Sequence, residues 1–241
     1  MPVSIRATTA AARGLAAGLA ALTLVLVGPV VGLVAGLGAQ AQELTRLYAP
    51  KPPAGSAYVR VIDLSRSGAP IALGTGPAMP VGQGDTATIY RVVKGGAPLA
   101  VSIDGRPVAG EPVPAADAFS TVVVPAGGPA VVIADSTEGR NDLKAQLRFY
   151  NLVPGCDGAV TVADGGPTVF EAVAPNATRQ RAINPIEAIL SATCGAAASG
   201  PLTLPSLKAG DHYSLFLLPG ASGPVLTGQR DETEPYRGAG N

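Results

Sequence analysis

Short runs of apolar residues, separated by breaks rich in glycine and proline, recur along most of the chain. The runs are rich in Val, Ile, Leu, Thr and Tyr, a pattern typical of β-strands joined by turns. Long runs with a helical period of 3.6 residues are missing. We therefore expect an all-β fold. The clearest predicted strands are Tyr58–Leu64, Thr86–Val93, Ala100–Ile103, Phe119–Val124, Ala130–Ala134, Gln146–Leu152, Ala159–Val162, Val169–Val173, Ile186–Ala192 and Tyr213–Leu218.

The two halves of the pattern resemble each other. Tyr58–Leu64 aligns with Gln146–Leu152 at an offset of 88, and Phe119–Pro125 aligns with Tyr213–Pro219 at an offset of 94. Such an internal duplication predicts two tandem β-sandwich domains. The expected organisation is a signal peptide at 1–41, a Pro-rich lead-in at 42–57, a first domain at 58–137, a linker at 138–144, a second domain at 145–230 and a polar tail at 231–241.

The first forty residues have the features of an export signal. Arg6 and Arg13 precede a long apolar run over 14–37, no acidic residue occurs among them, and Ala39-Gln40-Ala41 provides small residues for cleavage after Ala41. An uncleaved anchor is the alternative, because the run is long enough to span a bilayer. Gly28-Pro29 within the run and the Ala-x-Ala ending favour cleavage and an exported chain.

The composition excludes several classes of protein. The 241 residues contain 17 basic and 17 acidic residues, so the formal net charge is zero, which argues against a nucleic-acid-binding protein. Hydrophobic residues make up 47% of the chain, enough for a globular core. One His and two Cys exclude a Cys/His metal site, and the sequence predicts neither a metal nor a cofactor.

The two cysteines are expected to form a disulfide. Cys156 and Cys194 would lie in an oxidising compartment after export, where disulfides persist. Closing a loop of this length stabilises a fold by about 3–4 kcal/mol. A catalytic thiol is the competing interpretation, but no neighbouring base supports it.

The pattern predicts no catalytic site. His212 is the single histidine, and the adjacent Asp211 would point to the opposite face of a strand, where it could not orient the ring. The chain also has no Gly-x-Ser-x-Gly elbow. We therefore expect a protein that is not an enzyme. An acetyl-ester transferase or hydrolase using His212 and a simple carbohydrate-binding module remain the alternatives.

Three segments resemble the AlgF family of alginate biosynthesis proteins. Leu47-Tyr48-Ala49-Pro50 followed by Pro53-Ala54-Gly55-Ser56 and Tyr58-Val59-Arg60-Val61 is similar to the opening of the family's first domain. Arg181-Ala182-Ile183-Asn184-Pro185 resembles a second family motif, and Leu147–Leu152 resembles the start of its second domain. The chain departs from the family pattern at Asp63, where the family has Asn, and at its two cysteines. These departures leave open which polysaccharide is acetylated, alginate or a related polymer.

The resemblance implies a periplasmic accessory factor built of two β-sandwich domains. It implies a role in O-acetylation of an exported polysaccharide, alginate or a related polymer. It further implies that the chain bridges a membrane-bound O-acyltransferase and SGNH-type acetyltransferases without transferring acetyl groups itself.

Two groups of residues are candidate contacts. A stiff extended segment suits partner recognition, although it could instead pack along its own domain; its residues are Tyr48, Pro50, Pro52 and Pro53. Polar residues on apolar strands or beside them could bind an anionic polysaccharide, although pairing with local acids, an exposed loop or a turn would also explain them; these are Arg60, Arg148, Arg179, Arg181 and Asn184. Arg60 and Arg148 hold equivalent positions and should face solvent or the domain junction.

Overall fold

The computed structural model describes residues 51–238, and every regular element in this range is a β-strand, so the all-β prediction is confirmed. The strands are β1 (Ser56–Asp63), β2 (Ile71–Leu73), β3 (Arg91–Lys94), β4 (Val101–Ile103), β5 (Arg106–Pro107), β6 (Phe119–Val124), β7 (Val131–Asp135), β8 (Ala145–Asn151), β9 (Gly158–Val162), β10 (Thr168–Val173), β11 (Ala177–Ile183), β12 (Ile189–Cys194), β13 (Ala197–Ala198), β14 (Leu202–Thr203), β15 (His212–Leu218) and β16 (Val225–Arg230). The predicted signal peptide, Tyr48 and Pro50 lie outside the described residues. Within 51–238, no helix is long and apolar enough to cross a membrane.

Two sheets enclose the core of the first half, residues 56–135. A four-stranded sheet has the order β3-β1-β6-β7, and a three-stranded sheet has the order β2-β4-β5. Alternate residues of β1 and β6, such as Val59 and Val122, point into the core between the sheets, where Ile71 and Val101 of the smaller sheet meet them.

The second half, residues 145–230, repeats this plan. A four-stranded sheet of order β11-β8-β15-β16 packs on a five-stranded sheet in which β10-β9-β12-β13 lie in order and β14 pairs with β12. Phe149 and Leu215 of the first sheet and Val160 and Leu190 of the second are fully or almost fully buried between them.

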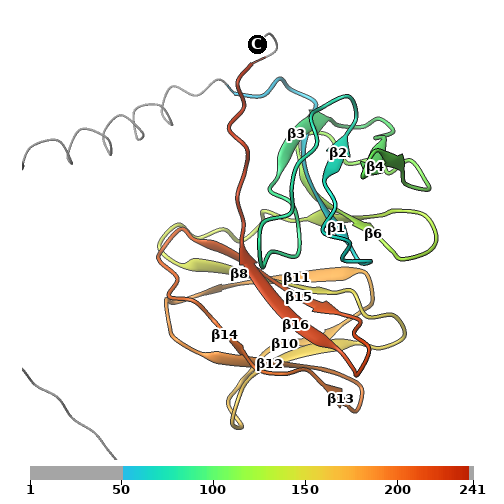
Figure 1. The fold of residues 1–241 in the computed structure, drawn as a ribbon. Coiled ribbons are helices and arrows are strands. Elements are labelled where there is room, and N and C mark those ends of the chain that lie inside the picture. The colour runs from blue at the N-terminus through green and yellow to red at the C-terminus, as the bar shows by residue number, and fades with distance from the viewer. Residues whose placement is uncertain (1–50, 239–241) are drawn as a thin grey trace, which may run out of the picture. The chain divides into compact units, whose positions relative to one another are not determined.

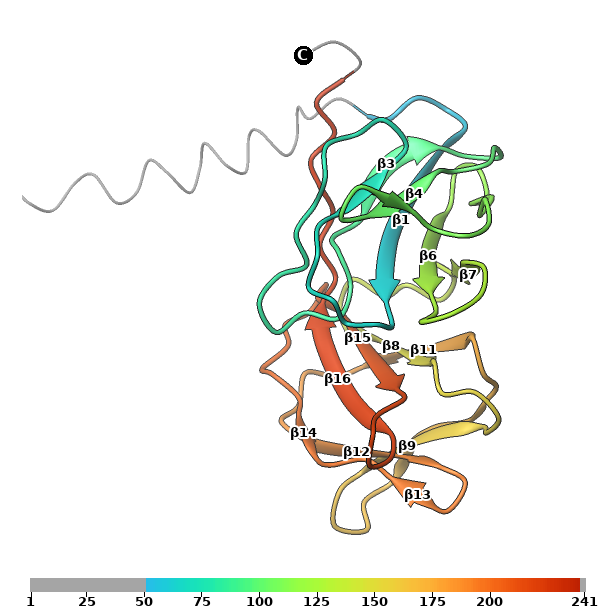
Figure 2. The same ribbon diagram turned by 45° about the vertical axis from the view of Figure 1, so that its right-hand side comes forward.

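The two four-stranded sheets lie next to each other (Figures 1 and 2), and a third apolar cluster lies between them. Ile62 and Val123 of the first half contact Tyr150 and Phe216 of the second, and all four are at most 1% exposed. The central strands β1, β6, β8 and β15 are therefore covered on both faces. This is why their sequences are almost continuously apolar, as in strands with no solvent face.

The duplication extends to the strand pairing. In each four-stranded sheet the two central strands are parallel and the outer strands antiparallel, so β1 corresponds to β8 and β6 to β15. Arg60 pairs with Thr121, and Arg148 pairs with Ser214. Thr121 and Ser214 are 93 positions apart, so the alignment of β6 with β15 at an offset of 94 is wrong by one residue. A one-residue slip assigns every side chain to the opposite face.

The predicted disulfide between Cys156 and Cys194 is present, with Cα atoms 5.5 Å apart. It ties the loop between β8 and β9 to the last residue of β12, which pairs with β9 in the same sheet.

Some predicted strand limits are wrong. Of 86–93, only Arg91 onward forms a strand, while Thr86 to Tyr90 run along the junction of the halves. Arg179 to Arg181, considered as an exposed loop, belong to the edge strand β11.

Candidate functional site

Arg60 is buried at the junction of the two halves, with an exposed fraction of 0%. Its Nε donates to Thr121 Oγ1 in the neighbouring strand at 2.9 Å. Its terminal nitrogens donate to the second half and the segment after it, to Tyr150 Oη at 2.7 Å, Ser214 Oγ at 2.9 Å and Asp231 Oδ1 at 2.7 Å. The expected position at the junction is confirmed, but a solvent-facing position is not, and no surface of Arg60 is left to bind a polymer carboxylate.

Aromatic rings surround the Arg60 guanidinium. Its central carbon lies 4.6 Å from the Tyr90 ring centre, 5.1 Å from that of Tyr150 and 5.2 Å from that of Phe216. Such contacts stabilise a cation by about 0.5–2 kcal/mol each when water is excluded. Burial by itself would lower the Arg60 pKa, but Asp231 and the neighbouring groups outweigh it and hold the pKa well above its usual value. Arg60 is therefore a permanent buried cation.

Asp231 and Asp135 are equivalent acids of the two halves. Each lies at the end of the last strand of its four-stranded sheet. Each contacts a hydroxyl group on the neighbouring strand, that of Thr121 in β6 or of Ser214 in β15. Ser214 Oγ donates to Asp231 at 2.6 Å, and Thr121 Oγ1 donates to Asp135 at 2.7 Å. Asp231 begins the segment predicted as a polar tail, yet its side chain is only 9% exposed.

Two tyrosine hydroxyls complete the network around Asp135. Tyr90 donates to it at 2.7 Å and Tyr150 at 2.5 Å. Burial raises the Tyr150 pKa to about 12, although nearby Arg60 acts in the opposite direction. Tyr150 therefore stays a neutral hydroxyl that donates to Asp135.

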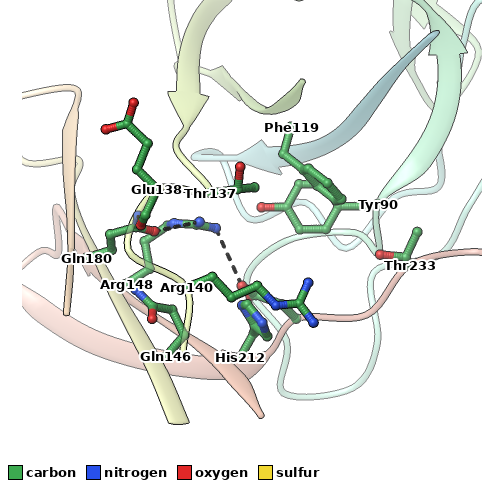
Figure 3. A pocket seen from close by; sticks show the side chains of 11 residues that line it. Tyr90, Phe119, Thr137, Glu138, Arg140, Gln146, Arg148, Gln180, His212 and Thr233 are labelled. Carbon is green, nitrogen blue, oxygen red and sulfur yellow. Dashed lines mark hydrogen bonds and ion pairs between the residues drawn. The ribbon is translucent and has the colours of Figure 1, made fainter. Parts of the chain in front are cut away.

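Arg148, the counterpart of Arg60, lines a cavity of about 220 Å³ at the same junction (Figure 3). It donates to Ser136 O at 2.6 Å and to Gln180 Oε1 at 3.0 Å, and its Nη1 lies 3.7 Å from Asp231 Oδ2. Its exposed fraction is 6%. The predicted position at the junction is confirmed for Arg148, whose side chain reaches a space that a ligand could enter. The cavity is lined by Tyr90, Phe119, Thr137, Glu138, Arg140, Gln146, Arg148, Gln180, His212, Asp231 and Thr233.

His212 lines this cavity from the first residue of β15. Burial lowers its pKa below the usual 6.5, Asp231 opposes that change, and Arg140 and Arg148 add to it. The ring is therefore mainly neutral at neutral pH. Asp211 turns away from it, accepting a hydrogen bond from Lys208 N at 2.7 Å and pairing with Arg230.

The hydroxyl two residues after His212 is not arranged as a nucleophile. Ser214 is 0% exposed, and its Oγ donates to Asp231 while it accepts from Arg60. Within the described residues, no hydrogen bond joins His212 to a serine hydroxyl. A Ser-His-Asp triad needs a serine hydroxyl hydrogen-bonded to one ring nitrogen of the histidine and a carboxylate hydrogen-bonded to the other. His212 and Ser214 do not have this arrangement.

The other predicted polymer contacts lie elsewhere. Arg181 and Asn184 border a groove of about 380 Å³ together with Lys144 and apolar residues such as Ile183 and Ile186. Arg179 is exposed on the same strand but does not line the groove. Of the predicted partner-binding prolines, Pro52 is half-buried and Pro53 is exposed, immediately before β1.

Three residues of this site were not predicted from the sequence: Asp231, Gln146 and Tyr90. A signal for Asp231 was available, since both halves place an Asp at the end of an apolar run: Asp135 is the last residue of β7, and Asp231 directly follows β16. Gln146 and Tyr90 carried no such signal. Within residues 51–238, no group of three or more His, Cys, Asp or Glu side chains could hold a metal ion.

Comparison with known proteins identifies the family. The family model described as "Alginate O-acetyl transferase AlgF" matches residues 30–214. This chain belongs to the AlgF family. The alginate biosynthesis protein AlgF of Pseudomonas aeruginosa is 29% identical to it over 183 residues, which cover 74% of this chain and 80% of that relative.

Two solved structures resemble parts of the chain. The C-terminal domain of AlgF from P. aeruginosa is 25% identical, with a TM-score of 0.33, and the match covers 36% of this chain and 98% of that domain. A family CBM26 module of Eubacterium rectale Amy13K, solved with maltoheptaose, is 12% identical, with a TM-score of 0.24, and covers 75% of this chain and 98% of that module. Membership of the AlgF family connects the chain with O-acetylation of alginate.

Asp63 has a local structural role in the turn after β1. Its carboxylate accepts hydrogen bonds from the backbone N–H groups and hydroxyls of Ser65 and Ser67, and so closes the turn after β1. Burial by itself would raise the pKa of Asp63, but these bonds outweigh it and lower the pKa below its usual value.

Proposed function

We propose that this AlgF-family protein is a non-catalytic periplasmic adaptor for O-acetylation of alginate or a related exported polysaccharide. After removal of residues 1–41, its two β-sandwich domains connect a membrane-bound O-acyltransferase with SGNH-type acetyltransferases. The single observation that carries the proposal, beside the family, is the junction centred on Arg60. An adaptor must hold two partner-binding halves in a constant relation, and a fully buried cation bonded to both halves favours one arrangement.

The surroundings of His212 support a role without catalysis. The neighbouring Ser214 and Asp231 already bind Arg60, so neither is free to serve a reacting ester. The competing acetyl-ester transferase or hydrolase predicts turnover of an acetyl ester by the purified protein and its loss in His212→Ala. Turnover with that dependence would overturn the adaptor proposal.

The bridging role is tested by co-purification of the partners with each other. A tagged O-acyltransferase is isolated from cells that contain or lack this protein, and the captured SGNH-type acetyltransferase is quantified. We expect capture only when the protein is present. Equal capture in its absence would contradict bridging, whatever the protein contributes otherwise.

Polymer binding is a second candidate function, favoured by the groove beside β11. Lys144 and Arg181 place two cations along it, and Asn184 adds an amide, the kind of groups that bind uronate carboxylates and hydroxyls. Arg181→Ala should weaken binding of an alginate oligosaccharide several-fold. Arg179→Ala is the matched control, because it removes an equal charge from the same strand outside the groove. Equal loss in both variants would indicate only a general charge effect.

A further inference from the structure

Two buried polar atoms in the wall of the junction cavity have no hydrogen-bond partner. They are Arg148 Nε and Gln146 Oε1, and both residues are only 6% exposed. Buried polar groups in folded proteins are almost always hydrogen-bonded, and an unpaired one costs about 1–3 kcal/mol. The side chains lie on neighbouring alternate positions of β8 and border the same cavity.

The internal duplication explains why the donor is free. In the first half, Arg60 Nε donates to Thr121 Oγ1, the hydroxyl of the paired residue. The paired residue of Arg148 is Ser214, but its hydroxyl donates to Asp231 and accepts from Arg60. The hydrogen bond that Arg60 Nε makes to the paired hydroxyl is thus unavailable to Arg148. Its Nε is left without an acceptor in the wall of the cavity.

The charges around the cavity favour an anion. Arg148 and Arg140 border it as cations, and two acids border it as well. Asp231 lies 2.7 Å from Arg60 and 3.7 Å from Arg148, so its charge is offset by buried cations. Glu138 is exposed, and its carboxylate points away from the other labelled side chains in Figure 3. Arg140 is also paired, with Asp142, but that pair is exposed and therefore weak. On the other side of the space lie the rings of Tyr90 and Phe119 (Figure 3).

We propose that this cavity binds a carboxylate that carries a neighbouring hydroxyl group, such as a single sugar acid. The carboxylate accepts from Arg148 Nε, the hydroxyl donates to Gln146 Oε1, and the carbon face of the ligand packs against Phe119. A space of about 220 Å³ suits one such unit. This site goes beyond the adaptor role and does not depend on it.

The test is a titration of the purified protein with sodium D-mannuronate, followed by calorimetry and by chemical shifts of the Gln146 side-chain amide. D-mannose is the matched control ligand, because it differs only in carrying an uncharged hydroxymethyl group in place of the carboxylate. We expect saturable binding of mannuronate and at least about tenfold weaker binding of mannose, since an unmet charged donor costs about this much. No saturable binding, or equal binding of both sugars, would overturn the proposal.

Gln146→Glu places a like charge beside the bound carboxylate and should weaken binding at least about tenfold. Gln83→Glu adds the same charge at an exposed site outside the cavity and should leave affinity unchanged. Thermal unfolding of both variants checks that they are folded. Equal affinity of the folded Gln146→Glu variant and the unmodified protein would overturn the proposal.

The source of the ligand is distinguished by two further probes. Glycolate represents a free small hydroxy acid, and a mannuronate oligosaccharide represents a unit within a polymer. Binding of either one that is lost in Gln146→Glu supports the site and identifies the source. Binding of neither, while D-mannuronate itself binds, identifies the free monosaccharide acid as the ligand.

Discussion

Arg60 and Asp231 lie 171 positions apart in the chain, yet their side chains form an ion pair of 2.7 Å at the junction of the two halves. The Arg60 side chain is 1% exposed and that of Asp231 is 9% exposed. The pair therefore connects β1 of the first half with the segment that follows the final strand β16.

Breaking this pair should destabilise the protein strongly. Asp231→Ala leaves the Arg60 charge buried without its closest acid, and removal of one partner of a buried pair costs about 3–5 kcal/mol. The free energy of unfolding from urea denaturation measures the loss. Arg140→Ala is the matched control, because the Arg140–Asp142 pair has the same 2.7 Å separation but side chains that are 60% and 73% exposed. The control should lose about 1 kcal/mol or less, and similar losses in both variants would contradict the account.

Truncation should locate the end of the essential chain. A protein ending at Pro235 keeps Asp231, the backbone bonds that join Tyr90 to Glu232 and Glu234, and the Arg91–Glu234 pair. A protein ending at Arg230 loses all of them. We expect the longer form to melt close to the full chain and the shorter form to melt well below it. Equal melting temperatures would show that the segment after β16 has no structural role.

The disulfide should stabilise the second half. Replacing Cys156 and Cys194 together by Ser removes a cross-link across 38 positions, and the unfolded chain gains entropy worth about 3–4 kcal/mol. Urea denaturation with and without a reducing agent measures this. Reductant should lower the stability of the unmodified protein and have no effect on the double variant. An effect of equal size on both would point to a cause other than the disulfide.

His212 should make the protein less stable in mild acid. Burial lowers its pKa in the folded state, so the unfolded chain binds a proton more readily. The neutral His212 ring contributes its full share to the stability of the fold above the unfolded-state pKa of about 6.5. This share is lost as the pH falls toward the lower pKa of the folded state. His212→Gln should therefore lose less stability than the unmodified protein between pH 8 and pH 5. An identical decline of the free energy of unfolding in both proteins would contradict the lowered pKa of His212.

The strands with the strongest apolar pattern could be predicted from the sequence. β6 was predicted with its observed limits, and β1 and β8 to within two residues at each end. β11 was not found as a strand, because an edge position tolerates residues such as Arg179 and Arg181 that weaken an apolar pattern.

The junction was only partly predictable. The repeat placed Arg60 and Arg148 at equivalent positions, and both do lie there. Local pattern could not reveal that Arg60 binds an acid 171 positions away or that Arg148 keeps a free donor. Those outcomes depend on how two sheets pack, and a single arginine within an apolar strand is compatible with either a solvent face or a buried partner.

The most direct test of the central claim is the acetyl content of the polysaccharide exported by cells that lack this gene. An adaptor required for O-acetylation predicts that polymer yield is maintained while acetyl groups are lost, and that the intact gene restores them. Polymer with unchanged acetyl content in the deletion strain would contradict the account.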